Sequence, residues 1–429
     1  MAETIPIKAW RYNPALTKDI ATLTSPLFDV VSERQRENLY QNPYNSIHLS
    51  VPRKSNSEDT LNKWKKAGII QQDLISGIYV YYQYFKLQGN QKEHCRKGFI
   101  CNIKIYDWDE KVILRHENTL PKSVNERTAL LAKTQLNVSA THGLYSDDTF
   151  TLEKYMDESM RTPLYEIEDY QGVREVLSVI HDAEIVALFK QNILEKQIIL
   201  ADGHHRYESS LAYKKQQESS NPNHTGKEGY NYHMMYLTNL ESNDLRILAT
   251  HRLINHIEDF DEQKTLTKLS EYFTLKPVEN PYEVNEIIVG KQWAFGLLFK
   301  ENAYKIRLKP GMISKISWNF PAIIKSLDLT VLHYFILEKA LAIKGEAQTT
   351  SNHISFERNF ADCLNRVTKE DAQLAIITNE ITMQEVKKVC FSGHTLPPKS
   401  TYFYPKIICG FLFSSIKNNE FSPNTDFSV

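Results

Sequence analysis

The residues best suited to chemistry stand together in one short segment, Asp202-Gly203-His204-His205-Arg206. An apolar run at residues 197–201 precedes it, and residues 207–217 have the composition of a helix, so the pattern predicts a strand that turns at a glycine into a helix. The start of a helix offers peptide N–H groups and the positive end of the helix dipole, which favour anions. Arg206 and the two imidazoles add donors. We therefore interpret the segment as a phosphate-binding, nucleotide-binding loop.

Two other interpretations of this segment remain open. Asp202 could be a plain helix cap, with the histidines packed or solvated. A metal site built from Asp202, His204 and His205 is disfavoured, because adjacent residues at the start of a helix point apart. We assign no metal ligand.

A second chemical group follows the apolar residues 112–114. Glu117 comes just after the end of this expected strand, beside His116. A carboxylate in such a place can act as a general base, which contributes roughly 10²- to 10⁴-fold in rate. The alternative is an exposed or salt-bridged glutamate.

Weaker signals lie elsewhere in the chain. Asp29 follows a Ser-Pro turn and could bind a substrate amine or Mg²⁺. The pair His251 and Arg252 is expected at the end of a strand and could face the same cleft. The possible contacts to an anionic ligand in the C-terminal part are Lys399, Ser400 and Lys406.

The elements that must position these groups follow from hydrophobic periodicity, residue types and turn signals. Residues 1–60 are rich in turn signals, so long regular elements are not expected there. In the first region, 1–258, we expect strands at 77–85, 98–106, 197–201, 232–238 and 246–253 and helices from 125, at 182–192 and at 207–217. In the second region, 259–429, we expect strands at 293–299, 304–308, 374–378 and 407–413 and helices at 261–273, 329–341 and 383–389. The fold class is mixed α/β (α+β), in two regions.

Composition restricts the partners. The 429 residues carry 51 Lys and Arg against 52 Asp and Glu, a net charge of −1, so no global field attracts nucleic acid or an anionic membrane. Five cysteines without a CxxC pair indicate a reducing compartment. No apolar run has the length of a membrane span, and the N-terminus lacks the features of a signal peptide. We expect a cytoplasmic protein that acts on a small molecule; the oligomeric state is left open.

Several longer motifs carry a resemblance. The core Ala201-Asp-Gly-His-His-Arg-Tyr-Glu208 occurs together with four further motifs, Ser25-Pro-Leu-Phe-Asp-Val30, Arg115-His-Glu-Asn-Thr119, Thr250-His-Arg-Leu253 and 396–406. In this order they resemble the domain of unknown function 1015 family over nearly the whole chain. More distantly, the sequence resembles the ParB/sulfiredoxin superfamily, which includes free-serine kinases.

The superfamily resemblance implies a ParB/sulfiredoxin-like core with large N-terminal and C-terminal elaborations. It implies a kinase that transfers a phosphoryl group from ATP or ADP to a hydroxyl, with Mg²⁺ and with free serine as the first candidate acceptor. Glu117, with His116 and Asp202, would be catalytic, and Gly203, His204, His205 and Arg206 would hold the phosphates of the nucleotide. Glu117 and the Asp202 loop should then lie in one cleft. The alternatives are a ParB-like nucleotide-binding DNA partition protein and a non-catalytic sensor of a phosphometabolite.

Overall fold

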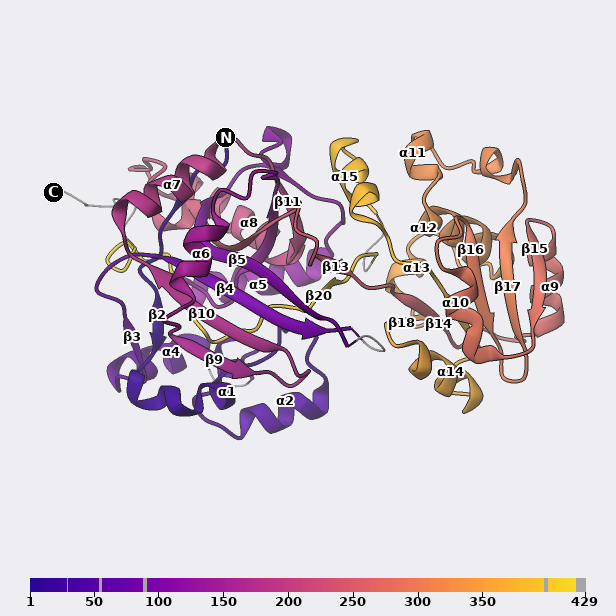
Figure 1. Cartoon of the computed structure of the whole chain (residues 1–429), viewed down its shortest axis with the longest axis horizontal. Helices are drawn as coiled ribbons and strands as arrows, with labels where there is room; N and C mark the ends of the chain where they lie inside the picture. The colour runs from indigo at the N-terminus through magenta and orange to yellow at the C-terminus, as the bar shows by residue number, and fades with distance from the viewer. Residues whose placement is uncertain (29, 54–55, 88–90, 397–399, 422–429) are drawn as a thin grey trace. The chain divides into compact units, whose positions relative to one another are not determined.

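The computed structural model describes residues 1–28, 30–53, 56–87, 91–396 and 400–421. It divides the chain into two compact units, shown in Figure 1. The first unit holds Met1–Arg115, Thr119–Leu245 and Pro405–Val429, and the second holds His116–Asn118 and Arg246–Tyr404. This division differs from the expected boundary at residue 258, because the chain leaves the first unit at Leu245 and returns to it at Pro405.

The first unit is built on a nine-stranded sheet of the described residues, in which β11 and β6 are parallel, β12 and β8 are parallel, and the other pairs are antiparallel. Strand β1 (Thr4–Ile5) pairs with β5 but is not part of the linear strand order that follows. The order along the sheet is β6 (Ile113–Leu114), β11 (Ile198–Asp202), β8 (Thr141–Tyr145), β12 (Tyr232–Asn239), β5 (Glu93–Lys104), β4 (Ile78–Lys86), β10 (Arg174–Ile180) and β9 (Tyr165–Glu168).

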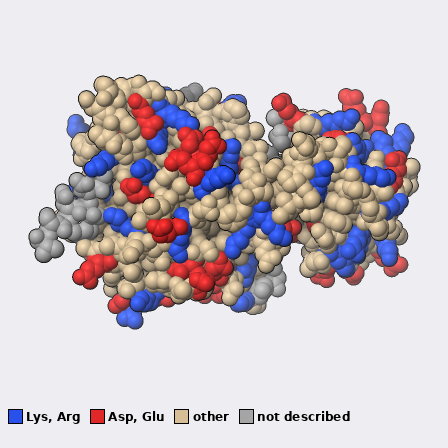
Figure 2. All heavy atoms as spheres, turned by 90° about the horizontal axis from the view of Figure 1, so that it is seen from above, with Lys and Arg blue, Asp and Glu red and all other residues tan. Residues whose placement is uncertain are grey.

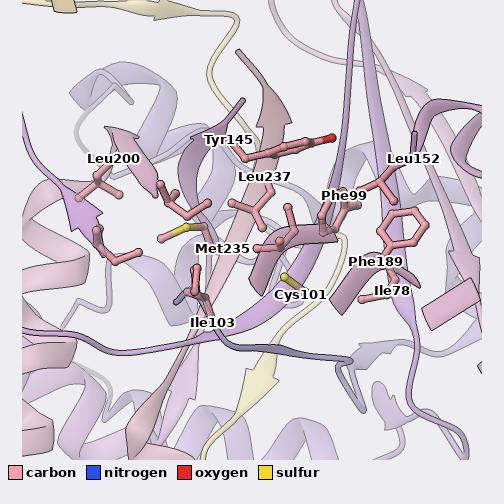
Figure 3. Close-up of a cluster of buried hydrophobic side chains, with 14 of the residues drawn as sticks. Ile78, Phe99, Cys101, Ile103, Tyr145, Leu152, Phe189, Leu200, Met235 and Leu237 are labelled. Carbon is pink, nitrogen blue, oxygen red and sulfur yellow. The ribbon is translucent and has the colours of Figure 1, made fainter. Parts of the chain in front are cut away.

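Both faces of this sheet are buried, as β4 illustrates. Ile78, Val80 and Tyr82 belong to one hydrophobic cluster, whereas Tyr79 and Tyr81 belong to another. Successive side chains of a strand point to opposite faces, so the two clusters lie on the two sides of the sheet. Figure 3 shows part of the first cluster, including Phe99, Cys101 and Ile103 from β5, with Met235 and Leu237 from β12.

Helices and short strands complete the first unit. Helix α5 (Pro121–Thr134) packs on α8 (His204–Ser220). The other helical segments of this unit are η1 (Pro14–Asp19), α1 (Ile20–Leu23), α2 (Glu33–Tyr40), α3 (Ile47–Ser50), α4 (Ser57–Lys66), η2 (Trp108–Glu110), α6 (Glu153–Ser159), α7 (Ala183–Leu194) and η3 (Gly229–Asn231). Two small ladders join β2 (Trp10–Tyr12) to β3 (Ile70–Gln72) and β7 (Leu136–Asn137) to β21 (Ser414–Ser415).

The second unit contains a six-stranded antiparallel sheet, which is also covered on both faces. Ile254, Leu374 and Ile376 belong to one cluster, and Leu253 and Ala375 to the other. The strand order is β15 (Phe273–Val278), β17 (Ala303–Leu308), β16 (Ala294–Leu298), β19 (Leu374–Ile377), β14 (His251–Ile254) and β18 (Ile354–Glu357). A separate two-stranded ladder joins β13 (Arg246–Ile247) to β20 (Phe403–Tyr404).

The helical segments of the second unit include a π-helix, η6 (Leu332–Ala340), which continues α12 (Asp328–Val331). The others are α9 (Glu262–Ser270), η4 (Pro281–Glu283), α10 (Val284–Ile288), η5 (Met312–Lys315), α11 (Ala322–Lys325), α13 (Ala347–Thr350), α14 (Phe360–Thr368) and α15 (Met383–Phe391).

The mixed α/β class is confirmed, and most expected elements are present, but three differ. Residues 407–413 form isolated bridges at Cys409 and Phe413 instead of a strand, because Gly410, with φ of +110°, interrupts the extended backbone. The expected strand 246–253 is divided into β13 and β14, so Arg252 lies near the start of a strand and not at its end. The expected helix 329–341 is largely a π-helix, whose hydrogen bonds span five residues instead of the four of an α-helix.

The surface and the helices agree with the charge and hydropathy of the sequence. Figure 2 shows Lys and Arg interspersed with Asp and Glu on the face in view. Among the described residues, no helix has both the length and the apolar character needed to cross a membrane.

Candidate functional site

The Asp202 loop has the predicted local geometry. All five residues of β11 are buried, the strand ends at Asp202, and α8 begins at His204. Gly203 between them has φ of +90°, a conformation that L side chains rarely adopt. A Cβ here would lie 2.7 Å from Thr141 Cγ2 and 2.8 Å from Arg206 Nη2. The glycine therefore permits the turn and the close approach of Thr141 and Arg206.

Asp202 is paired with two cations. Its Oδ2 accepts a hydrogen bond from Arg206 Nη2 at 2.9 Å, and its Oδ1 accepts one from Lys406 Nζ. The side chains of all three residues are nine-tenths buried or nearly so. Burial alone would raise the pKa of Asp202, but the charges of Lys406 and Arg206 outweigh it and hold the pKa well below its usual range. Asp202 is therefore a carboxylate at neutral pH.

Two cations, Arg206 and Lys406, thus bond to the one carboxylate of Asp202. Two buried histidines lie near these charges. Burial, followed by the charges of Arg96 and other cations, lowers the pKa of His142 well below its usual value, although Asp202 opposes this effect. Burial and the charge of Arg206 lower the pKa of His233 to about 3. Both imidazoles are therefore neutral at pH 7.

Arg206 is fixed on several sides. Its Nη1 donates to Ser139 Oγ at 3.0 Å and to the carbonyl of Ala140. Its Nε has no hydrogen-bond partner among the described residues. Arg206 also lines a cavity of about 60 Å³, with Ser50, Ser139 and His233 among the other lining residues. A cavity of this size can hold several water molecules or a small polar group.

The two histidines of the loop are placed differently. His204 is buried. His205 Nε2 accepts a hydrogen bond from the backbone N–H of Leu120 at 2.9 Å, and Leu120 is the N-cap residue of α5. His205 therefore ties the start of α5 to the start of α8.

His116 and Glu117 belong to the second unit. His116 is buried, and a hydrogen bond of 2.8 Å joins its Nε2 to Thr401 Oγ1. The backbone N–H of Leu396 donates to the carbonyl of His116 at 2.6 Å, and Glu117 forms a parallel bridge with Leu396. The expectation that Glu117 and Asp202 share one cleft stays a prediction, because the two residues belong to different units.

Arg252 is the most unusual buried cation of the second unit. It is fully buried on β14, and its Nη1 donates to the carbonyl of Thr250. Its Nε and Nη2 have no hydrogen-bond partner among the described residues. Burial lowers the pKa of Arg252 to about 10, and the charge of Glu117 opposes this shift. The Nε and Nη2 edge is the fork that receives a carboxylate in two parallel hydrogen bonds.

For the remaining predicted residues, the structure shows few contacts that bear on function. His251 Nδ1 accepts a hydrogen bond from the backbone N–H of Thr378 at 3.2 Å, and burial with the nearby Arg252 lowers its pKa to about 4. Ser400 is buried in the second unit. Asp29 and Lys399 lie outside the described residues.

The partners of the loop were not predicted from the sequence. Arg206 follows Asp202 by four residues, and this spacing at the start of a helix could have suggested their ion pair. Asp202 and Lys406 are 204 positions apart in the sequence, and no local sequence pattern predicts that they pair. The roles of Ser139, His142 and His233 likewise depend on the tertiary structure.

The described residues around Asp202 do not form a preformed metal site. Within the part of the chain that the structure describes, no three His, Cys, Asp or Glu residues gather to hold an ion. Both oxygens of Asp202 are engaged by Arg206 and Lys406. A Mg²⁺ ion that binds with a nucleotide needs only one or two protein carboxylates, so a preformed cage is not required.

Fold and site together define a two-unit α/β protein with an electropositive strand-to-helix loop. The chain belongs to the family described as protein of unknown function (DUF1015), whose model matches residues 4–330. No curated protein matches the sequence.

Three solved structures are similar at low identity. A conserved hypothetical protein from Pyrococcus furiosus is 12% identical, with 69% of this chain and 89% of that chain covered and a TM-score of 0.35. A free serine kinase in complex with AMP is 13% identical, with coverages of 72% and 86% and a TM-score of 0.35. SbnI with a C-terminal truncation, from Staphylococcus aureus, is 12% identical, with coverages of 71% and 85% and a TM-score of 0.34. At these values the likenesses assign no activity to this chain.

Proposed function

We propose that this protein is a nucleotide-dependent small-molecule kinase, which transfers a phosphoryl group from ATP or ADP to a hydroxyl, with free serine as the first acceptor to test. The observation that carries the proposal is the pair of cations, Arg206 and Lys406, that gathers around Asp202 at the start of α8. Asp202 is bonded to both Arg206 and Lys406. An anion that binds there would be attracted to two oriented cations and to the dipole of α8.

The residues of the proposed donor site belong to the first unit. Phosphoryl transfer requires mainly positioning and neutralisation of charge on the phosphates. Arg206 and Lys406 supply the charge, and Asp202 keeps both cations in place. Gly203 has no Cβ, which lets Arg206 lie close to the turn. Mg²⁺ is proposed only as a companion of the nucleotide, where it would neutralise charge on the phosphates.

The proposed acceptor residues lie in the second unit. Arg252 presents the fork of Nε and Nη2 while fully buried, and Glu117 is close enough for its charge to raise the pKa of Arg252. A small molecule with a carboxylate would satisfy the fork, and a hydroxyl beside it would give Glu117 a proton to accept. Serine has both groups. The role of Glu117 as base requires that the acceptor hydroxyl and the donor phosphate meet.

The test is a transfer assay with the full-length protein. ATP or ADP carrying a labelled terminal phosphate would be incubated with Mg²⁺ and a panel of hydroxyl compounds, including serine and its decarboxylated analogue ethanolamine. We expect label in phosphoserine and little in phosphoethanolamine, because ethanolamine lacks the carboxylate. Hydrolysis alone, or binding of nucleotide without transfer to any acceptor, would contradict the kinase proposal; the second result would favour a sensor of phosphometabolites.

A further inference from the structure

We propose that Gln83 and Arg96 are positioning residues that hold Lys406 against Asp202. The consequence of this arrangement for donor affinity rests on the proposed function. The positioning itself concerns only the first unit and can be tested without a ligand.

The two residues face each other across neighbouring strands. Gln83 on β4 is the register partner of Arg96 on β5, and both side chains are fully buried. Arg96 Nε donates to Gln83 Oε1 at 3.0 Å. Arg96 Nη2 donates to the same oxygen, so two donors of this buried arginine are used within the pair, whereas its Nη1 has no hydrogen-bond partner among the described residues.

Both side chains also bond to one short segment that comes from far away in the sequence. Gln83 Nε2 donates to the carbonyl of Lys406 at 3.0 Å, and Arg96 Nη2 donates to the carbonyl of Pro405. Two consecutive carbonyls are thereby bonded to side chains of the central sheet. This segment is where the chain returns to the first unit, after β20 ends at Tyr404 and before the bridge of Cys409 with Ser25.

The hydrogen bonds from Gln83 and Arg96 to the backbone fix the position of the main chain at Lys406, from which its side chain extends. A lysine ammonium group sits on a flexible four-carbon stem, so it reaches one partner reliably only when its backbone is fixed. With residues 405 and 406 held, Lys406 Nζ bonds to Asp202 Oδ1. Asp202 in turn holds Arg206. Gln83 and Arg96 thus act on the phosphate-binding cluster through Lys406, without belonging to it.

The first experiment measures how exposed Lys406 is to a reagent. The full-length protein and its Gln83→Leu variant would be acylated briefly with acetic anhydride, and the modified lysines identified by mass spectrometry. We expect Lys406 to react several-fold faster in Gln83→Leu. Lys214 is an internal reference, because its Nζ bonds to the carbonyl of Ile105 in the same unit. Tyr81→Phe is the matched control, because Tyr81 bonds to Glu175 in the same buried network but not to residues 405 and 406.

The labelling results distinguish a specific effect on the position of Lys406 from a general destabilisation of the first unit. Unchanged labelling of Lys406 in Gln83→Leu, or an equal rise at Lys214, would overturn the proposal. An equal rise of Lys406 in Tyr81→Phe would also overturn it, because the specific bonds to the segment would then be irrelevant. Arg96→Lys, which keeps the charge, is expected to lie between wild type and Gln83→Leu.

The second experiment is a double-mutant cycle on ADP affinity. Gln83→Leu and Lys406→Met should each weaken ADP binding, and the double variant should bind no more weakly than Lys406→Met alone, because Gln83 acts through Lys406. Effects that multiply would overturn the link between the two residues. If the labelling result holds but Lys406→Met binds ADP as wild type does, the positioning stands and the proposed phosphate site is wrong.

Discussion

Asp202 illustrates how a single residue can be read in two ways. As a lone carboxylate after a strand it would be a helix cap or, from the superfamily resemblance, a catalytic residue beside Glu117. In the structure both of its oxygens are bonded to cations, so it is the counter-ion that holds Arg206 and Lys406 together. Its contribution to catalysis, on the proposed function, is to orient two phosphate-binding side chains.

Replacement of Asp202 should reveal this role through pH dependence. Asp202→Asn leaves two nearly buried cations without their carboxylate, and we expect a loss of about 3–5 kcal/mol in the free energy of unfolding at pH 7. Because the pKa of Asp202 is depressed in the folded state, its contribution is complete above the unfolded pKa of about 3.9 and is lost as the pH falls through the folded value. Urea unfolding at pH 7 and below pH 4 would measure both effects. A difference between wild type and variant that stays constant with pH would contradict the ion pairing.

Glu117 should affect turnover and not donor binding. Glu117→Gln removes the proton acceptor but keeps the shape, so we expect transfer to fall by roughly 10²-fold or more. Nucleotide affinity, measured by calorimetry, should change little. A variant that retains full transfer activity would remove Glu117 from the role of base.

Some of the site could be predicted at the level of residues, and some could not. The strand, the glycine turn and the helix start follow from a buried apolar run, a glycine and a helical pattern, and all three are present around Asp202. The partners Lys406 and Ser139 are distant in sequence, and their contacts depend on the path of the chain between them. The burial of Arg252 could not be predicted either, because an Arg-Leu pair in a strand does not say which residue is covered.

At the scale of elements, the turn between β11 and α8 makes a prediction about glycine. Gly203→Ala places an L residue at φ of +90° and brings its Cβ into Thr141 and Arg206. Gly172→Ala is the matched control, because Gly172 has φ of +76° but nothing within 4 Å of the added Cβ. Thermal or urea unfolding should show a loss of roughly 1–2 kcal/mol for the control, from backbone conformation alone, and a larger loss for Gly203→Ala. Equal losses would mean that the close contacts at Gly203 are unimportant.

The central sheet makes a second prediction at this scale. Glu175 on β10 is fully buried and accepts hydrogen bonds from Tyr81 at 2.6 Å and Gln83 at 3.1 Å. Burial raises the pKa of Glu175 to about 8, despite these opposing hydrogen bonds. The folded state therefore holds a proton that the unfolded state releases near pH 4.3, so stability from this group falls as the pH rises from about 4.3 to about 8.

Glu175→Gln should remove that slope. The amide keeps an acceptor for Tyr81 but does not titrate. Chemical unfolding between pH 5 and pH 8 should show wild type losing stability relative to the variant as the pH rises. Parallel profiles for the two proteins would show that Glu175 does not titrate in this range.

Element prediction succeeded where residue type and burial agreed. The aromatic and β-branched run of β4 suits a strand whose two faces are both covered. It failed at residues 407–413, where similar residues are interrupted by Gly410 and bonded only at isolated bridges. A strand needs a partner along its length, and the sequence of one segment does not report whether a partner is there.

At the scale of the whole molecule, the chain forms one discontinuous unit and one nearly continuous unit. The first is completed by residues 405–421, which supply Lys406, β21 and part of the second hydrophobic cluster. The return of the chain at Pro405 could not be predicted from the sequence, because the composition does not change where the chain crosses from one unit to the other.

This organisation predicts where a nucleotide should protect the backbone. Hydrogen exchange of the full-length protein with and without ADP should show slower exchange at residues 198–210 and 404–410 and little change in β15, β16 and β17. At a concentration 100-fold above Kd, a ligand that binds only the folded state stabilises it by about 2.7 kcal/mol. Protection confined to the strands of the second unit would contradict the placement of the donor phosphates.

A calorimetric titration of ADP into wild type and Arg206→Ala tests the proposed phosphate site at the start of α8 most sharply. Arg206 is a buried, charged donor at the start of α8, so its loss should weaken ADP binding by about 1.5–3 kcal/mol, which is roughly 10- to 150-fold in Kd. Arg174→Ala is the control, because Arg174 is an exposed arginine of the same unit that pairs with Glu166. We predict that ADP binds to wild type and to Arg174→Ala with the same affinity and to Arg206→Ala much more weakly. Equal affinities for all three proteins, or no binding of ADP to wild type, would show that Arg206 does not bind the phosphates of a nucleotide.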